Sequence, residues 1–239
     1  MMWKWKLNLS LRKKKRLMNK ELEKRLRNLM VELNQSTLVA VSKYSPVEEV
    51  LEAYSYGQID FGENRVSELK EKSEKFQSQK NDKVRWHFIG GLQTKKVREL
   101  LKIPNLWAIH SVGSIKLVEE LIKREADFNG SELKLFFQLN TSHEEEKSGF
   151  ESIEELMEGM SLINSLKNSK LKVLGLMTMG AIRTENFETS AIMSFRELKN
   201  ARAQIGNPDL KLSMGMSQDY KIALKEGADY VRLGSIIFK

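Results

Sequence analysis

The chain has 239 residues, of which 41% are hydrophobic and 30% charged, a composition typical of a folded globular protein and not of a disordered chain. It contains no cysteine, which excludes disulfides, thiolate nucleophiles and cysteine-ligated metal sites; its three histidines, His87, His110 and His143, are too scattered for a metal-binding motif. The net charge of +8 resides in residues 1–34, with eleven Lys/Arg against three Glu, whereas the remainder has 29 charges of each sign, which excludes a basic surface on the main domain.

Residues 1–17 form a basic N-terminal tail, which we expect to be disordered and to lie outside the domain at residues 18–239. The run from Arg12 to Arg16 resembles phosphate-binding stretches, but such runs are usually solvated, so nucleic-acid binding is not expected. No apolar stretch follows the charges, so the tail is not a signal peptide. We hypothesise that natural translation starts at Met18, which leaves a net charge of +1. We expect a cytoplasmic protein without a membrane partner, because the longest apolar runs are too short to span a bilayer.

A helix is predicted from Met18 onward by apolar residues at helical spacing, namely Leu22, Leu26, Leu29, Met30 and Leu33. Next, Leu38–Val41 is a short apolar run typical of a buried strand. Ser45, Pro46 and Glu48 predict a capping box with proline at the first helical position. The helix that follows is expected to bury Val47, Val50, Leu51 and Tyr54, and to end at Gly57 in a left-handed conformation.

The same strand and helix unit then recurs along the chain. Seven further strands are predicted: Ile59–Gly62, Val84–Ile89, Leu106–His110, Lys134–Leu139, Lys172–Met177, Lys211–Ser213 and Tyr230–Leu233. Amphipathic helices fit between them at Ser114–Lys123, Ile153–Leu166, Phe187–Ala201 and Gln218–Lys225, the last closed by Gly227. Eight alternating units predict an α/β fold, a single (β/α)8 TIM barrel with an extra N-terminal helix. An open doubly wound sheet is the alternative, although its usual G-x-G-x-x-G is missing.

Ligands of such barrels bind at the carboxyl ends of the strands, and Lys43 stands at the end of the first one, in V-A-V-S-K. A lysine there is expected to be partly desolvated, which favours the neutral amine that attacks an aldehyde. The alternative is a solvated lysine that begins a loop. His87 lies mid-strand between Trp86 and Phe88, so we interpret it as a hydrogen-bonded structural residue and not as an acid–base group.

Small residues end the seventh and eighth strands, where phosphates commonly bind in this fold. We predict an anion site made by backbone N–H groups of the segments Ser213–Ser217 and Arg232–Ser235, to which the hydroxyls of Ser213 and Ser235 add donors. The alternative is turn chemistry, with Ser217 as the N-cap of the last helix. Because a closed barrel places its eighth strand beside its first, this site and Lys43 would be neighbours. Pyridoxal 5′-phosphate, which has both an aldehyde and a phosphate, would satisfy both.

Seven motifs occur in order between Leu38 and Phe238: V-A-V-S-K-Y-S-P, F-G-E-N, W-H-F-I-G-G-L-Q, K-S-G-F, G-L-M-T-M, L-S-M-G-M-S-Q-D and V-R-L-G-S-I-I-F. Together they resemble the pyridoxal phosphate homeostasis protein family, the single-domain relatives of the alanine racemase N-terminal barrel. Lys95 and Gly113 depart from the family pattern, which has Asn and Asp there. Neither position is among those that the resemblance assigns to the cofactor.

The resemblance implies that Lys43 holds pyridoxal 5′-phosphate as a Schiff base and that Arg232 faces the pyridine nitrogen. Ser213, Met214, Gly215, Gly234 and Ser235 match the phosphate-binding segments, and Asn64 matches a residue near the cofactor. An arginine that keeps the ring nitrogen unprotonated weakens the cofactor as an electron sink.

The resemblance further implies a role in intracellular pyridoxal phosphate (vitamin B6) and amino-acid homeostasis, with pyridoxal-phosphate-dependent apoenzymes as partners. No second domain is expected, and none of the residues suggests a second catalytic base, so we favour a cofactor-binding protein, expected as a monomer or weak dimer. The alternative is an amino-acid racemase or lyase that uses the same lysine.

Overall fold

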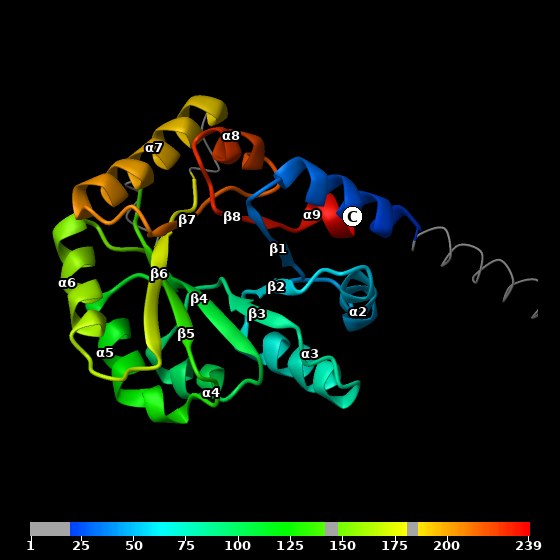
Figure 1. Ribbon diagram of the computed structural model, residues 1–239, viewed down its shortest axis with the longest axis horizontal. Coiled ribbons are helices and arrows are strands. Elements are labelled where there is room, and N and C mark those ends of the chain that lie inside the picture. Colours follow the sequence, from blue (N-terminus) through cyan, green and yellow to red (C-terminus); the bar gives the residue numbers. More distant parts are fainter. Residues whose placement is uncertain (1–19, 142–147, 181–185) are drawn as a thin grey trace, which may run out of the picture.

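Figure 1 shows the computed structural model of the protein, in which parallel strands close into a barrel surrounded by helices. The structure describes residues 20–141, 148–180 and 186–239. The basic tail, the hypothesised start at Met18 and His143 lie outside these residues. Each strand pairs in parallel with the next one, and β8 pairs with β1, which confirms the predicted (β/α)8 barrel and rules out the open sheet.

All eight predicted strands are present, with ends that differ from the predicted ones by at most two residues. They are β1 Thr37–Val41, β2 Asp60–Glu63, β3 Arg85–Phe88, β4 Leu106–Val112, β5 Leu133–Gln138, β6 Leu171–Met177, β7 Lys211–Ser213 and β8 Tyr230–Leu233. The helices are α2 Val47–Ser55, α3 Val66–Ser78, α4 Val97–Leu101, α5 Ile115–Arg124, α6 Ile153–Asn164, α7 Phe187–Ile205, α8 Tyr220–Lys225 and α9 Ser235–Phe238. Most of the apolar core lies between these helices and the outer face of the strands.

The N-terminal helix, described over residues 20–33, packs one leucine face against the outside of the barrel. Leu22, Leu26, Leu29 and Leu33 are buried on it, as the helical spacing predicts. The prediction for Met30 was wrong, since 40% of its surface is exposed. Met30 follows Leu29 by one residue, about 100° further around the helix, which turns it away from the core.

The start of α2 also differs from the prediction. Pro46 is the N-cap residue and no side chain caps the helix, while the Ser45 N–H donates to the carbonyl of Ser42. The predicted capping box is therefore wrong, because Ser45 belongs to the turn that leaves β1. Gly57 has φ +95°, which confirms its predicted left-handed conformation after the helix.

The inside of the barrel is both aromatic and polar. The rings of His87, Trp107, His110, Phe136 and Tyr230 contact one another there, with His110 stacked on Phe136 at a centroid distance of 4.2 Å. His87 is fully buried and hydrogen-bonded, which confirms its interpretation as a structural histidine.

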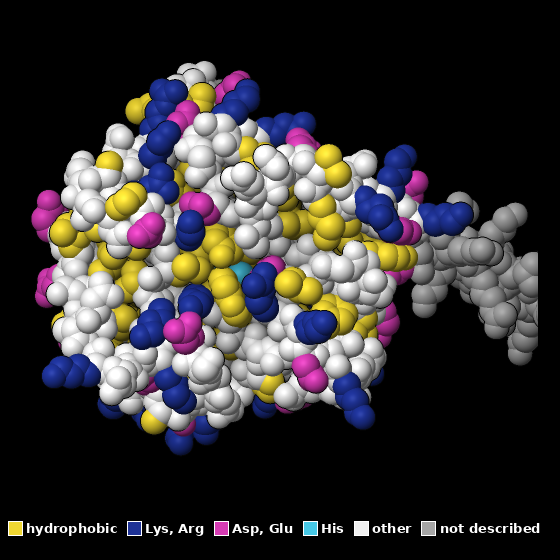
Figure 2. Space-filling view, viewed as in Figure 1, with side chains coloured by type: hydrophobic (Ala, Val, Ile, Leu, Met, Phe, Trp, Pro, Cys, Tyr) yellow, Lys and Arg dark blue, Asp and Glu magenta, His cyan; other side chains and the backbone are white. Residues whose placement is uncertain are grey.

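The surface carries charges of both signs. Figure 2 shows Lys and Arg side chains interspersed with Asp and Glu over the face in view, without one extended patch of a single sign. Such a surface agrees with the balanced charge of the residues after position 34. Among the described residues, no helix is both long enough and apolar enough to cross a membrane.

Candidate functional site

The carboxyl ends of β1 and β8 bring two of the predicted residues together. Val39 of β1 is in register with Arg232 of β8, so the strand that ends beside Lys43 runs next to the strand that holds the arginine. A Cβ atom at Gly234 would lie 3.1 Å from the carbonyl oxygen of Val41. The missing side chain of Gly234 therefore allows the turn after β8 to lie against the end of β1.

Lys43 occupies a tight turn that directly follows β1. The turn is closed by a hydrogen bond from the Ser45 N–H to the Ser42 carbonyl, 2.9 Å, and Tyr44 within it has φ +73°. The Lys43 side chain is exposed, with its Nζ 5.7 Å from the centre of the Tyr44 ring. The expected partial desolvation is therefore absent from this structure.

A buried ion pair holds the residue before Lys43. Lys72, on α3, donates to the Ser42 carbonyl at 2.8 Å and to the carboxylate of Glu63, while the Ser42 hydroxyl donates to the same carboxylate at 2.6 Å. Burial raises the pKa of Glu63, although the charge and hydrogen bond of Lys72 oppose that shift. These contacts hold the backbone before Lys43, whereas the Lys43 side chain itself is exposed.

Asn64 follows β2 directly and is half-buried. Its Oδ1 atom is buried and has no hydrogen-bond partner among the described residues. A Cβ at Gly90 would lie 2.1 Å from the Asn64 carbonyl oxygen, so only glycine allows this close approach of the turn after β3. The Asn64 amide is thus a polar group in need of a partner near the carboxyl ends of the strands.

The turns after β7 and β8 are joined by two hydrogen bonds. The Arg232 N–H donates to the Gly215 carbonyl at 2.9 Å, and the Gly234 N–H donates to the Ser217 hydroxyl at 3.2 Å. Gly215 has φ +92°, which a residue with a side chain rarely adopts. Ser217 does not cap α8, whose N-cap residue is Asp219, so the predicted N-cap is wrong. Its hydroxyl instead joins the two turns.

Two residues predicted for the anion site have other contacts. Ser213 is fully buried, and its hydroxyl contacts Arg232 Nη1 and His110 Nδ1, each at 2.8 Å. Met214 is also fully buried and its N–H donates to the Tyr230 carbonyl at 3.0 Å. Strand register explains both placements, because β7 reaches Ser213 and its ladder continues through Met214. The assignment of Gly215, Gly234 and Ser235 to an anion site stays a prediction.

Arg232 is the buried cation of the site. Its Nη1 donates to the Ser213 hydroxyl and its Nη2 to the Thr178 carbonyl, both at 2.8 Å, and only 4% of its surface is exposed. Burial lowers the pKa of Arg232 to about 10, while the charge of Asp219 opposes the shift. The guanidinium therefore stays protonated at neutral pH, and three of its five N–H donors have no acceptor among the described residues.

The sequence analysis missed two groups of interacting residues. Glu63 and Lys72 form one group, and Asp60, His87 and His110 form the other, inside the barrel. For the second group, the available signal was a polar residue at an inward position of each of three strands. Of the two family departures, Gly113 has a structural reason, since a Cβ there would lie 2.9 Å from the Gly149 Cα; Lys95 is exposed in a short 3-10 helix.

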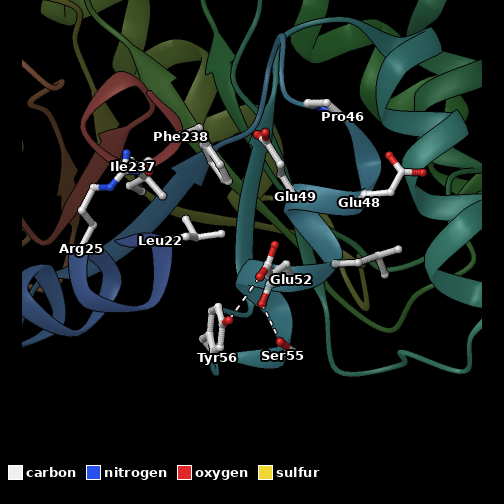
Figure 3. Close-up of a pocket in the computed structure, with 11 residues that line it drawn as sticks. Leu22, Arg25, Pro46, Glu48, Glu49, Glu52, Ser55, Tyr56, Ile237 and Phe238 are labelled. Carbon is white, nitrogen blue, oxygen red and sulfur yellow. Dashed lines mark hydrogen bonds between the residues drawn. The ribbon is translucent and has the colours of Figure 1, made fainter. Parts of the chain in front are cut away.

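A separate cavity of about 690 Å³ lies outside the barrel, between the N-terminal helix, α2 and α9. Figure 3 shows three glutamates of α2, Glu48, Glu49 and Glu52, on one side of it, with Leu22 and Arg25 of the N-terminal helix opposite. None of the residues predicted for the cofactor lines this cavity. We therefore place the candidate site at the barrel mouth, where the cationic and small residues converge.

Comparison with known proteins identifies relatives over most of the chain. It is 38% identical over 218 residues to the human pyridoxal phosphate homeostasis protein, with 85% of this chain and 76% of that protein covered. The protein of the same name from Schizosaccharomyces pombe is 38% identical over 206 residues, covering 84% and 82%. No protein-family model matches the chain.

Solved structures agree with these relatives. PipY of Synechococcus elongatus, determined with PLP bound, is 30% identical and superposes with a TM-score of 0.77 over 91% of this chain and all of that one. Alanine racemase of Corynebacterium glutamicum, at 14% identity and a TM-score of 0.69 over 92% of this chain and 61% of its own, shows the shared barrel fold alone. On the sequence identities and their coverage, this chain belongs to the pyridoxal phosphate homeostasis protein family.

Proposed function

We propose that this protein binds pyridoxal 5′-phosphate at the carboxyl end of the barrel, held as a Schiff base on Lys43, and acts as an intracellular carrier in vitamin B6 and amino-acid homeostasis. The observation that carries the proposal is the placement of one protonated, buried arginine beside the strand whose end bears a free lysine. Both lie next to a pair of glycine turns at the phosphate-binding end of the fold.

The residues present fit such a cofactor. Arg232 has spare N–H donors, Asn64 has a buried Oδ1 without a partner, and Gly215 and Gly234 leave room where a side chain would collide with neighbouring residues. The first N–H groups of α9, at Ser235 and Ile236, lie within the first four positions of the helix and so have no acceptor in it. The Ser213 hydroxyl and the Met214 N–H already have hydrogen-bond partners inside the barrel, so these residues would support the site without binding the phosphate themselves.

Each residue has a separate task in this proposal. The Lys43 amine would form the covalent link, and Ser42, held by Glu63 and Lys72, would limit where that amine can reach. Arg232, whose guanidinium only donates, would face the ring nitrogen and favour its unprotonated form. The cofactor supplies a reactive aldehyde and, with its ring nitrogen unprotonated, only a weak electron sink. Binding and release therefore suit this site better than carbanion chemistry.

The exposure of Lys43 further supports a carrier. An exposed lysine is accessible both to incoming cofactor and to the amines of competing acceptors, which include pyridoxal-phosphate-dependent apoenzymes. A link formed there exchanges without a large rearrangement of the barrel. We expect free amines to remove the cofactor from the protein faster than spontaneous release does.

The test is visible absorption of the purified protein after addition of pyridoxal 5′-phosphate, followed by borohydride reduction and peptide mass spectrometry. We expect a yellow band that borohydride removes, with the added mass on the peptide that contains Lys43. Lys43→Ala is expected to abolish the band, whereas Lys102→Ala, a change at an exposed lysine on the outside of the barrel, leaves it unchanged. A colourless protein, or modification spread over many lysines, would contradict the proposal.

A further inference from the structure

A continuous set of hydrogen bonds crosses the inside of the barrel, beginning at Arg232. Arg232 Nη1 donates to the Ser213 hydroxyl at 2.8 Å, and this hydroxyl lies 2.8 Å from His110 Nδ1. All three side chains are buried, and they come from β8, β7 and β4. Among the described residues, the arginine therefore hydrogen-bonds to no carboxylate; its acceptors are the Ser213 hydroxyl and the Thr178 carbonyl.

The set continues toward the amino ends of the strands. His110 Nε2 lies 2.9 Å from His87 Nδ1, and His87 Nε2 lies 2.8 Å from Asp60 Oδ1. Arg85 donates to the other carboxylate oxygen of Asp60 at 2.5 Å. The path thus ends at an ion pair of which Arg85 is partly exposed, at the end of the barrel opposite the candidate site.

With both imidazoles neutral, the Asp60 end fixes the direction of every proton along the path. Asp60 as a carboxylate only accepts, so His87 has its proton on Nε2 and donates to it. His87 Nδ1 then accepts from His110 Nε2–H, and His110 Nδ1 accepts the proton of the Ser213 hydroxyl. The Ser213 oxygen also accepts from Arg232, because a guanidinium only donates. Both histidines are neutral in this arrangement, and both are Nε2–H tautomers.

The electrostatics of the same residues agree with this assignment. Burial lowers the pKa of His87, and it lowers the pKa of His110 further, where the charge of Arg232 adds to the effect. For Asp60, burial acts to raise the pKa, but the hydrogen bonds of His87 and Arg85 and the charge of Arg85 lower it, and the net shift is downward. A positive charge at one end and a negative charge at the other are therefore joined by neutral groups.

We propose that Ser213, His110, His87 and Asp60 form a one-directional hydrogen-bond relay that positions Arg232 for its contact with the cofactor ring and couples that contact to Asp60 at the far end of the barrel. These four are positioning residues, since they act through the arginine. The relay deepens the proposed function and depends on it only for the identity of the ligand.

The first test needs no cofactor. Nitrogen-15 NMR of the imidazoles in the cofactor-free protein is expected to show His87 and His110 as neutral Nε2–H tautomers. Because Asp60 fixes the direction, Ser213→Ala should retain these tautomers, whereas Asp60→Asn, whose amide can donate as well as accept, should mix them. A wild-type Nδ1–H tautomer at either residue, or a charged imidazole at neutral pH, would overturn the relay whether or not the variants fold.

The second test measures the coupling to the cofactor. Ser213→Ala is expected to weaken retention of pyridoxal 5′-phosphate about tenfold and to shift its visible band, and Asp60→Asn to do so about threefold. Ser73→Ala is the matched control, because it removes a buried hydroxyl that donates to Pro104 outside the relay. Equal behaviour of Ser213→Ala and Ser73→Ala, or no effect of Asp60→Asn, would overturn the coupling. A wild-type protein that binds no cofactor refutes the proposed function while the NMR result still decides the relay.

Discussion

The two sides of the barrel mouth hold their cations in opposite ways. On the β1 side, Lys43 is exposed, and the structure fixes only the backbone before it, through Ser42, Glu63 and Lys72 on the outer side of the strand. On the β8 side, Arg232 is buried and its guanidinium is itself fixed, through Ser213 on the inner side.

This difference corresponds to two different chemical tasks. A group that must form and break a covalent bond needs a defined origin and a mobile end, whereas a group that sets the polarity of a ring needs a fixed orientation. The β1 side satisfies the first requirement and the β8 side the second. We call Ser42, Glu63 and Lys72 the outer support, and Ser213, His110, His87 and Asp60 the inner support. Substitutions in the two supports should therefore change stability and cofactor retention in different ways.

The largest effect is expected from Lys72→Met, which breaks the outer support. It leaves the fully buried Glu63 without its positive partner, which should lower the free energy of unfolding by about 3–5 kcal/mol. Urea unfolding measures this loss. The control is Lys96→Met, which removes the exposed Lys96–Glu99 pair and should change the free energy of unfolding by no more than about 0.5 kcal/mol. Glu63→Gln added to Lys72→Met should restore part of the loss. Equal midpoints for Lys72→Met and the control would show that the pair is not a support.

A smaller loss is expected from Gly215→Ala, which acts on the β8 side. Gly215 and Gly227 share φ +92°, so alanine is strained at both, but only at Gly215 would the new Cβ collide, 2.6 Å from the Ala223 Cβ. We expect about 1 kcal/mol for Gly227→Ala and about 2–3 kcal/mol for Gly215→Ala. Cofactor retention should fall for Gly215→Ala alone. If both variants retain the cofactor equally, the turn after β7 takes no part in binding.

The last prediction concerns acidification, to which the two supports should respond with opposite sign. The folded-state pKa values of His87 and His110 lie below the ordinary value of 6.5, so the unfolded chain binds more protons as the pH falls below about 6.5. Stability is then lost on acidification, by up to about 1.4 kcal/mol per pH unit for each histidine. Glu63 acts in the opposite sense, because burial raises its pKa.

Unfolding by urea between pH 7.5 and about 5.5 measures this slope, and NMR titration of the two imidazoles assigns it. The double variant His87→Gln/His110→Gln should lose the slope. If the imidazoles of the folded protein titrate at their ordinary value, the inner support does not depend on neutral histidines.

The periodicity of the sequence was sufficient for the architecture, because each strand is a short apolar run and each helix has one apolar face. Periodicity failed to predict the helix N-caps, because contacts between separate elements decide which groups a serine near a helix binds. Ser45 and Ser217 both precede helices and fit the pattern of N-caps, yet their polar groups are used by Ser42 and Gly234. Sequence patterns describe neighbours along the chain, and these partners are set by the packing of turns.

The site shows the same division. Strand ends and the family motifs predict Lys43, Arg232, Gly215 and Gly234 around one ligand, and this stays a prediction; the structure shows β1 and β8 paired, with Val39 in register with Arg232. The contacts of the Ser213 hydroxyl with Arg232 and His110 could not be predicted, because they join strands that lie far apart along the chain. Together with Arg232, the four relay residues come from five strands, and no local pattern marks Asp60 as a member of this network.

Arg25 of the N-terminal helix donates to the carbonyl oxygens of Ile237 and Lys239, so the first described helix and the last residues of the chain are bound to each other. Arg25 and Ile237 are 212 residues apart, and a contact of such separation forms slowly. During synthesis on the ribosome, β1 therefore has an unpaired edge until β8 and α9 have left the exit tunnel. During that interval the unpaired edge of β1 can pair with strands of other chains, so we expect chaperone binding or rapid completion of the barrel to limit aggregation.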